Sequence, residues 1–167
     1  MWLLEFHSER IKITRRQIKV VFPIRSILAV ISVIIVTVVF VFPWNQDCSG
    51  DAACISGKVT EVTDGDTITV NDKPIRFALA CAPELDQFGG IESREFIEKL
   101  CPVGSPVLVD EDDGQIKGIY DRMIGLVRCN GKILNEELVT SGNGEIAVQF
   151  CSISEFSDMD WASKNGC

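Results

Sequence analysis

The stretch KVTEVTDGDTITVNDKPIRFALA, residues 58–80, decides the fold of this chain. Apolar and polar residues alternate in three of its segments, 58–62, 67–70 and 75–80, a pattern typical of β-strands with one buried face. The intervening TDGD and NDKP consist of turn-forming residues and are short enough for hairpins. The stretch therefore predicts a three-stranded meander.

The remainder of the sequence predicts two more strands and three helices. The strand patterns are Pro106–Asp110 and Arg122–Cys129, and the helical patterns are Ile91–Leu100, Leu134–Ser141 and Glu155–Asn165. An open sheet of five short strands would leave two exposed edges, which closure into a barrel removes. We therefore expect an α+β domain, a five-stranded β-barrel with helices, with the oligonucleotide/oligosaccharide-binding (OB) barrel as the leading candidate.

An uncharged stretch, SILAVISVIIVTVVFVFPW, occupies residues 26–44. At about 1.5 Å per residue, a helix of this length spans a hydrocarbon core of roughly 30 Å. A buried helix fits less well, because the stretch has no polar face. A cleaved signal peptide is the other alternative, but a small-residue cleavage site is missing and residues 1–25 are long for its basic region. The sequence predicts one N-terminal transmembrane helix, an uncleaved signal anchor.

The charges around this stretch predict its orientation. Residues 1–25 carry six Lys or Arg against two Glu, a net charge of +4. Basic residues stay on the cytoplasmic side of a membrane. We therefore predict a single-pass cell-membrane protein with a cytoplasmic segment 1–25, an anchor 26–44, a linker 45–56 and an extracytoplasmic domain 57–167.

The part of the chain after the anchor is strongly acidic. It holds the remaining ten Lys or Arg and 22 Asp or Glu, a net charge of −12. Such a domain repels nucleic-acid phosphates at long range, so phosphodiester chemistry on it needs a local cluster of arginines or a bound cation. The acidic run 110–113 is by itself typical of a solvated turn.

All seven cysteines follow the predicted anchor, which suits an oxidising exterior. Two lie close together in the linker, two end elements that should be neighbours in the barrel, and two bracket the tail helix, although six cysteines allow many other connectivities. The predicted disulfides are Cys48–Cys54, Cys101–Cys129 and Cys151–Cys167. These pairs leave Cys81 without a partner.

Four motifs follow one another along the domain: DGDT at 64–67, RFALACAPE at 76–84, YDR at 120–122 and GKILNEELV at 131–139. Each alone has an ordinary explanation, such as a turn, a strand end or a solvated arginine. Together and in this order they resemble the staphylococcal nuclease (thermonuclease) family, whose pattern is DGDT, R-x4-DTPE, Y-G-R and G-x3-NE-x-LV. The resemblance runs from about Gly57 to Ala147.

The resemblance implies an OB-type barrel and a calcium-dependent phosphodiesterase that acts on DNA or RNA. Arg76 and Arg122 match the two arginines whose planar forks bind phosphate oxygens. Glu84 matches the carboxylate that orients or deprotonates the attacking water. Tyr120 matches a residue that contacts a terminal phosphate, and Val148 stands where a substrate-binding tyrosine is expected.

The resemblance also implies a Ca²⁺ site. Asp66 matches a direct ligand, Ala82 would supply its backbone carbonyl, and Asp64 would support the ligands from outside. The family has a second ligand aspartate where this chain has Cys81, and a thiol is a poor ligand for a hard cation.

Two functions from different classes follow. The retained Arg76, Glu84 and Arg122 favour a membrane-anchored extracytoplasmic nuclease. The thiol at Cys81 and the acidic domain favour a non-catalytic OB-fold module that binds nucleic acid or protein. We expect the nuclease.

Overall fold

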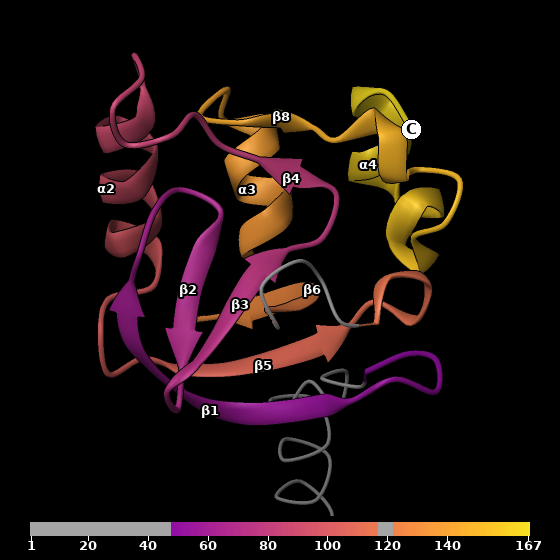
Figure 1. Cartoon of the computed structure of the whole chain (residues 1–167), viewed down its shortest axis with the longest axis horizontal. Helices are drawn as coiled ribbons and strands as arrows, with labels where there is room; N and C mark the ends of the chain where they lie inside the picture. The colour runs from indigo at the N-terminus through magenta and orange to yellow at the C-terminus, as the bar shows by residue number, and fades with distance from the viewer. Residues whose placement is uncertain (1–47, 117–121) are drawn as a thin grey trace, which may run out of the picture. The chain divides into compact units, whose positions relative to one another are not determined.

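The structure is a computed structural model whose described residues are 48–116 and 122–167 (Figure 1). Within those two ranges, no helix is long and apolar enough to cross a membrane. The predicted cytoplasmic segment 1–25 and the predicted anchor 26–44 lie outside the described residues, and so does Tyr120.

A closed, mixed β-barrel of five strands forms the centre of the domain. Its strands are β1 (Cys54–Val62), β2 (Thr67–Val70), β3 (Lys73–Phe77), β5 (Pro106–Glu111) and β6 (Met123–Cys129). Neighbours pair antiparallel in the order β3-β2-β1-β5-β6, and a parallel pairing of β3 with β6 closes the barrel. Ile68, Ile75 and Val109, which the alternating pattern places on the inner face, are fully buried. The predicted five-stranded barrel is therefore confirmed.

The turn between β2 and β3 fixes the register of the predicted meander. Asn71 and Asp72 both have positive φ, 47° and 65°. Two such residues in succession form the hairpin turn whose twist matches that of the flanking strands, and Asn and Asp tolerate it. As a result, Val70 pairs with Lys73 and Thr67 with Arg76.

Three helices lie beside the barrel in Figure 1, with α3 between α2 and α4. They are α2 (Gly90–Leu100), α3 (Leu134–Thr140) and α4 (Asp160–Asn165). The predicted tail helix is divided in two, because the backbone of Met159 is extended and separates α4 from the 3₁₀ turn η4 (Glu155–Asp158). Three further short elements are η1 (Asp113–Gln115), β7 (Lys132–Ile133) and η3 (Val148–Phe150).

Asn135 of α3 explains the asparagine in the GKILNEELV motif. Its side chain is fully buried. Its Oδ1 accepts from Val127 N at 2.9 Å, and its Nδ2 donates to Ala78 O at 2.8 Å and Gly125 O at 3.1 Å. A buried amide has to satisfy its donors and acceptor, so this residue ties α3 to β6 and to the end of β3.

The third predicted strand, 75–80, is shorter in the structure. β3 ends at Phe77, and Leu79 has a positive φ of 59°. The chain then forms β4 (Ala80–Cys81), which pairs with β8 (Glu145–Ile146) in a separate two-stranded sheet. This break moves Cys81 out of the barrel wall.

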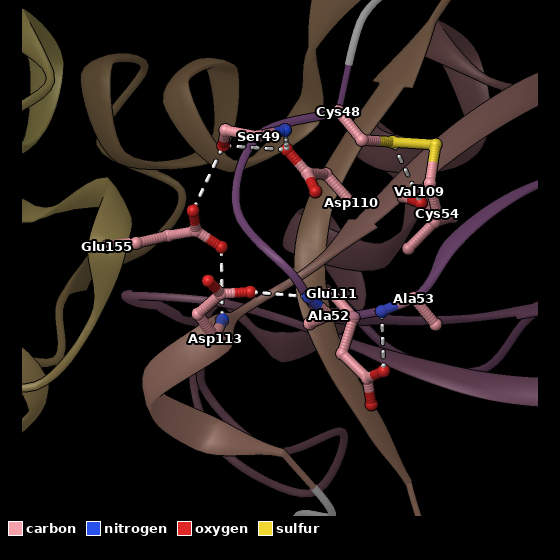
Figure 2. Close-up of a disulfide and its surroundings, with 10 residues drawn as sticks. All are labelled: Cys48, Ser49, Ala52, Ala53, Cys54, Val109, Asp110, Glu111, Asp113 and Glu155. Carbon is pink, nitrogen blue, oxygen red and sulfur yellow. Dashed lines mark hydrogen bonds between the residues drawn. A yellow bond between two sulfur atoms is a disulfide. The ribbon is translucent and has the colours of Figure 1, made fainter.

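The described part of the predicted linker, from Cys48 onward, is held on the domain. β1 already begins at Cys54, and the preceding loop 48–53 bonds to the end of β5 (Figure 2). Ser49 N donates to Asp110 Oδ2 at 2.8 Å. Ala53 N donates to Glu111 Oε2 at 3.2 Å. The sequence predicts a linker over 45–56, whereas residues 49 and 53 are hydrogen-bonded to the end of β5.

The acidic run 110–113 differs from the solvated turn that the sequence suggests. Asp110 is 2% exposed and Asp112 is fully buried. The two carboxylate oxygens of Asp112 accept from Gly114 N, Gln115 Nε2 and Glu155 N. The Asp113 carboxylate accepts from the amides of Asp51 and Ala52, as Figure 2 shows for Ala52. We name Asp110–Asp113 together with Glu155 the acidic clamp.

The three disulfides in the structure are the three that the sequence predicts, Cys48–Cys54, Cys101–Cys129 and Cys151–Cys167. The last two join α2 to β6 and close the tail around η4 and α4. Among the described residues Cys81 is the free cysteine.

Candidate functional site

The pairing of β2 with β3 brings the first two candidate residues together. Thr67 pairs with Arg76, and Phe77 N donates to Asp66 O at 2.8 Å. Asp66 ends the DGD turn, where Asp64 Oδ1 accepts from Asp66 N at 3.0 Å. Asp64 therefore shapes the turn that presents the Asp66 carboxylate.

Gly65 lets this turn pack closely against the rest of the site. A Cβ built on Gly65 would lie 2.6 Å from the Cβ of Ala82 and 2.6 Å from that of Ser93. Such distances leave no room for a side chain. The glycine of the DGDT motif is thus required by the approach of β4 and α2.

Asp66 is buried, with the residue 3% exposed, and its carboxylate accepts from three neighbours. Oδ1 accepts from Arg76 Nη1 at 2.6 Å and from Thr67 Oγ1 at 3.0 Å, and Oδ2 accepts from Ala82 N at 2.8 Å. Burial raises the pKa of Asp66 above its ordinary value, and the Arg76 charge opposes that rise. The ion pair is what allows a carboxylate to be buried here.

Cys81 lies on the other side of the Arg76 guanidinium. Arg76 Nη2 donates to Cys81 Sγ at 3.5 Å, and the thiol lies 3.9 Å from the carbonyl oxygen of Ala82 as a weak donor. Burial, and next the charge of Asp66, raise the pKa of the Cys81 thiol above its ordinary value. The thiol is therefore neutral at physiological pH.

A cavity of about 340 Å³ brings both candidate arginines to one place. The parallel register pairs Ile75 with Met123, so Arg76 and Arg122 flank that pair and line the same cavity. A largely apolar part of its wall comes from the η1 loop and from residues 147–153. It includes Ile116, Phe150 and Ile153. We name this space the arginine cavity.

Glu84 lines a different cavity. This second space, of about 470 Å³, is also lined by Cys81, Ala82 and Glu145. Glu84 is exposed, and its backbone N donates to Gln87 Oε1 at 3.3 Å. Cys81 lines both cavities and lies between the arginines and Glu84. The structure thus gathers Asp66, Arg76, Cys81 and Arg122, while Glu84 stands next to them.

The donor set does not fit the Ca²⁺ site that the resemblance implies. In the part of the chain that the structure describes, no three His, Cys, Asp or Glu side chains are grouped so that they could hold a metal ion. The one matched carboxylate, Asp66, already accepts from three donors, and the second ligand position is a thiol. Ca²⁺ takes about 6–8 oxygen ligands. The described residues therefore do not provide the ligands of the implied Ca²⁺ site.

Comparison with known proteins gives a partial match to a protein without a described activity. No protein-family model matches the chain. An uncharacterised protein of Bacillus anthracis is similar. It is 36% identical over 106 residues, which is 58% of this chain and 49% of that protein. The chain thus spans about half the length of this relative, whose description carries no activity.

The apolar wall of the arginine cavity is the part of the site that sequence reasoning missed. Phe150 belongs to η3 and Ile153 to the following turn, where no periodicity marks a face. Val148, which stands where a tyrosine is expected, is exposed. The nearby Phe150 lines the cavity, as does Phe77.

Proposed function

We propose that this chain is a membrane-anchored extracytoplasmic nuclease that hydrolyses phosphodiester bonds of DNA or RNA on an OB-type barrel of the staphylococcal nuclease kind. The observation that carries the proposal is the arginine cavity, in which Arg76 and Arg122 face one space. In an acidic domain, two guanidinium groups at one cavity form the local positive cluster that phosphodiester chemistry requires.

The arginines stabilise the charge that develops on the phosphate. Hydrolysis places negative charge on the equatorial oxygens, and guanidinium forks bind such oxygens through two parallel N–H bonds. The Asp66 ion pair orients Arg76 before substrate arrives, so little reorganisation is needed in the transition state. The apolar wall with Phe150 offers a surface for a nucleobase next to the bound phosphate.

Glu84 acts on water in this proposal. It is exposed and lines the neighbouring cavity, from which solvent reaches it. A carboxylate in this position can accept a proton from a water molecule whose oxygen attacks the phosphorus, while the P–O ester bond breaks and the leaving oxygen takes a proton from solvent.

The test of hydrolysis uses the full chain in detergent with single-stranded and duplex DNA and with RNA. We expect cleavage, and a loss of at least about hundredfold in turnover for Glu84→Gln, the scale of general-base catalysis. Glu92→Gln is the matched control, because Glu92 is an exposed glutamate on α2 outside both cavities. Equal turnover of Glu84→Gln and wild type would remove Glu84 from the mechanism.

The placement proposal rests on the uncharged stretch 26–44 and the net charge of +4 before it. Protease added to intact cells should digest the domain 57–167 and spare residues 1–25. A domain that stays intact until the membrane is permeabilised would contradict the proposed orientation.

The position of Glu84 also favours a second candidate, a non-catalytic OB-fold module that binds nucleic acid or protein. Glu84 and the two arginines line different cavities, with Cys81 between them. Such a module would bind an oligonucleotide at the arginine cavity and leave it uncut. An oligonucleotide that binds to the protein and is not cleaved would favour this candidate.

A further inference from the structure

We infer that the arginine cavity binds a phosphodiester without a divalent cation, and that the Arg76 guanidinium supplies beside Asp66 the positive charge that Ca²⁺ supplies in the family this chain resembles. The inference rests on the proposed function, because it concerns the same cavity and the same class of substrate. It follows from what each of the implied calcium ligands does in this structure.

The first implied ligand, Asp66, is already neutralised. Its Oδ1 lies 2.6 Å from Arg76 Nη1, and its side chain is 4% exposed. The three donors on Asp66 leave one acceptor position, on Oδ2. A cation bound there would lie close to the Arg76 guanidinium, and the repulsion between the two positive charges would weaken its binding.

The second and third implied ligands are also engaged. Cys81 offers sulfur in place of oxygen, and its Sγ accepts from Arg76 Nη2. The Ala82 carbonyl faces the thiol at 3.9 Å. Since Ca²⁺ prefers oxygen and takes about 6–8 such ligands, this set gives it a single carboxylate that is already paired.

Arg76 keeps the capacity to bind an anion while it holds Asp66. The bonds to Asp66 and Cys81 use one N–H on each terminal nitrogen, and each of these nitrogens carries two. The side chain is 28% exposed and lines the cavity. Arg122 lines the same space. The charge is therefore built into the protein and requires no ion from solution.

The deciding experiment measures binding by calorimetry, with the full chain in detergent. The probe is a short single-stranded DNA oligonucleotide, and Glu84→Gln is the protein, so that hydrolysis does not consume the probe. We expect the same dissociation constant, within about twofold, in EDTA and in millimolar CaCl₂. Binding that appears only with Ca²⁺ would overturn the inference and leave the proposed function standing. No binding of this oligonucleotide or of its RNA counterpart in either condition would overturn both.

A second arm titrates CaCl₂ alone into wild type, Cys81→Asp and Cys81→Ser. Aspartate restores an oxygen donor and a charge, whereas serine restores only a neutral oxygen. We expect Cys81→Asp to bind Ca²⁺ at least about tenfold more tightly than the other two, because the charge of the ligand set governs calcium affinity. Wild type that binds Ca²⁺ as tightly as Cys81→Asp would overturn the inference.

Discussion

Buried carboxylates occur both beside the arginine cavity and in the acidic clamp, but different groups hydrogen-bond to them. In the clamp, Asp112 and Asp113 accept mainly backbone amides from the loop 48–53 and from the start of η1 and η4. At the cavity, Asp66 holds a guanidinium that also faces open space. The acidic run 110–113 therefore holds neighbouring chain segments together, whereas the single carboxylate of Asp66 lies at the candidate site.

The partners of a buried carboxylate distinguish a structural role from a role at the candidate site. A carboxylate whose partners are mainly backbone amides fixes chain segments to one another, and its hydrogen-bonding capacity is used within the fold. A carboxylate paired with a half-exposed arginine positions that arginine toward a cavity. Changes at the cavity should then alter chemistry, and changes at the clamp should alter stability.

The largest effect is expected at the arginines. Arg122→Lys and Arg76→Lys should each lower turnover by at least about hundredfold, because lysine lacks the planar fork that binds two phosphate oxygens. Arg94→Lys is the matched control, since Arg94 is a half-buried arginine on α2 outside both cavities. Steady-state nuclease kinetics measure the effect, and unchanged turnover in both cavity variants would assign catalysis elsewhere.

At the clamp, Asp112→Ala should lower the free energy of unfolding by about 3 kcal/mol, because it leaves buried donors without an acceptor. The donors are Gly114 N, Gln115 Nε2 and Glu155 N. Urea unfolding measures the change, with the exposed Asp158→Ala as control. Turnover of the folded fraction should fall far less than in the arginine variants, although Gly114 and Gln115 line the cavity. A large loss of turnover with full stability would make the clamp part of the site.

A smaller and local effect is expected for Asp113→Ala. The amides of Asp51 and Ala52 would lose their acceptor, and they should exchange their hydrogens faster. Hydrogen exchange by mass spectrometry reports this. Unchanged protection of residues 51 and 52 would show that the disulfide and the bonds of Ser49 and Ala53 hold the loop without Asp113.

The smallest effect concerns the free thiol, which should be alkylated without any change in fold. Peptide mapping of the unreduced protein should find one modified cysteine among 48–167, at Cys81. A disulfide that includes Cys81 would contradict both the three pairs and the position of this thiol beside Arg76.

Local patterns in the sequence predict most of the barrel, because its information is short-range. The alternation in 58–80 and the NDKP turn specify the meander, and the cysteines lie at the ends of adjacent elements. The break at Leu79 escaped prediction, since Phe77, Ala78, Leu79 and Ala80 form an unbroken apolar run that continues a strand as well as it ends one.

The features that depend on distant partners could not be predicted. Asp112 is buried because Glu155 N and an amide of η1 donate hydrogen bonds to it. The sequence of residues 110–113 contains no pattern that predicts these donors. The motifs predicted Asp66 and Arg76 as site residues, but their ion pair depends on the register of β2 and β3. The separation of Glu84 from the arginines depends on β4 leaving the barrel wall.

The central claim, that Arg76 and Arg122 together bind the substrate phosphate, is tested most directly by NMR of the arginine Nε–Hε groups. The full chain in detergent is titrated in EDTA with a single-stranded oligonucleotide, and the arginine-to-lysine variants assign the signals. We expect the Arg76 and Arg122 signals to shift together along one binding curve while the Arg94 signal stays in place. Saturable binding that leaves both cavity signals unmoved would contradict it.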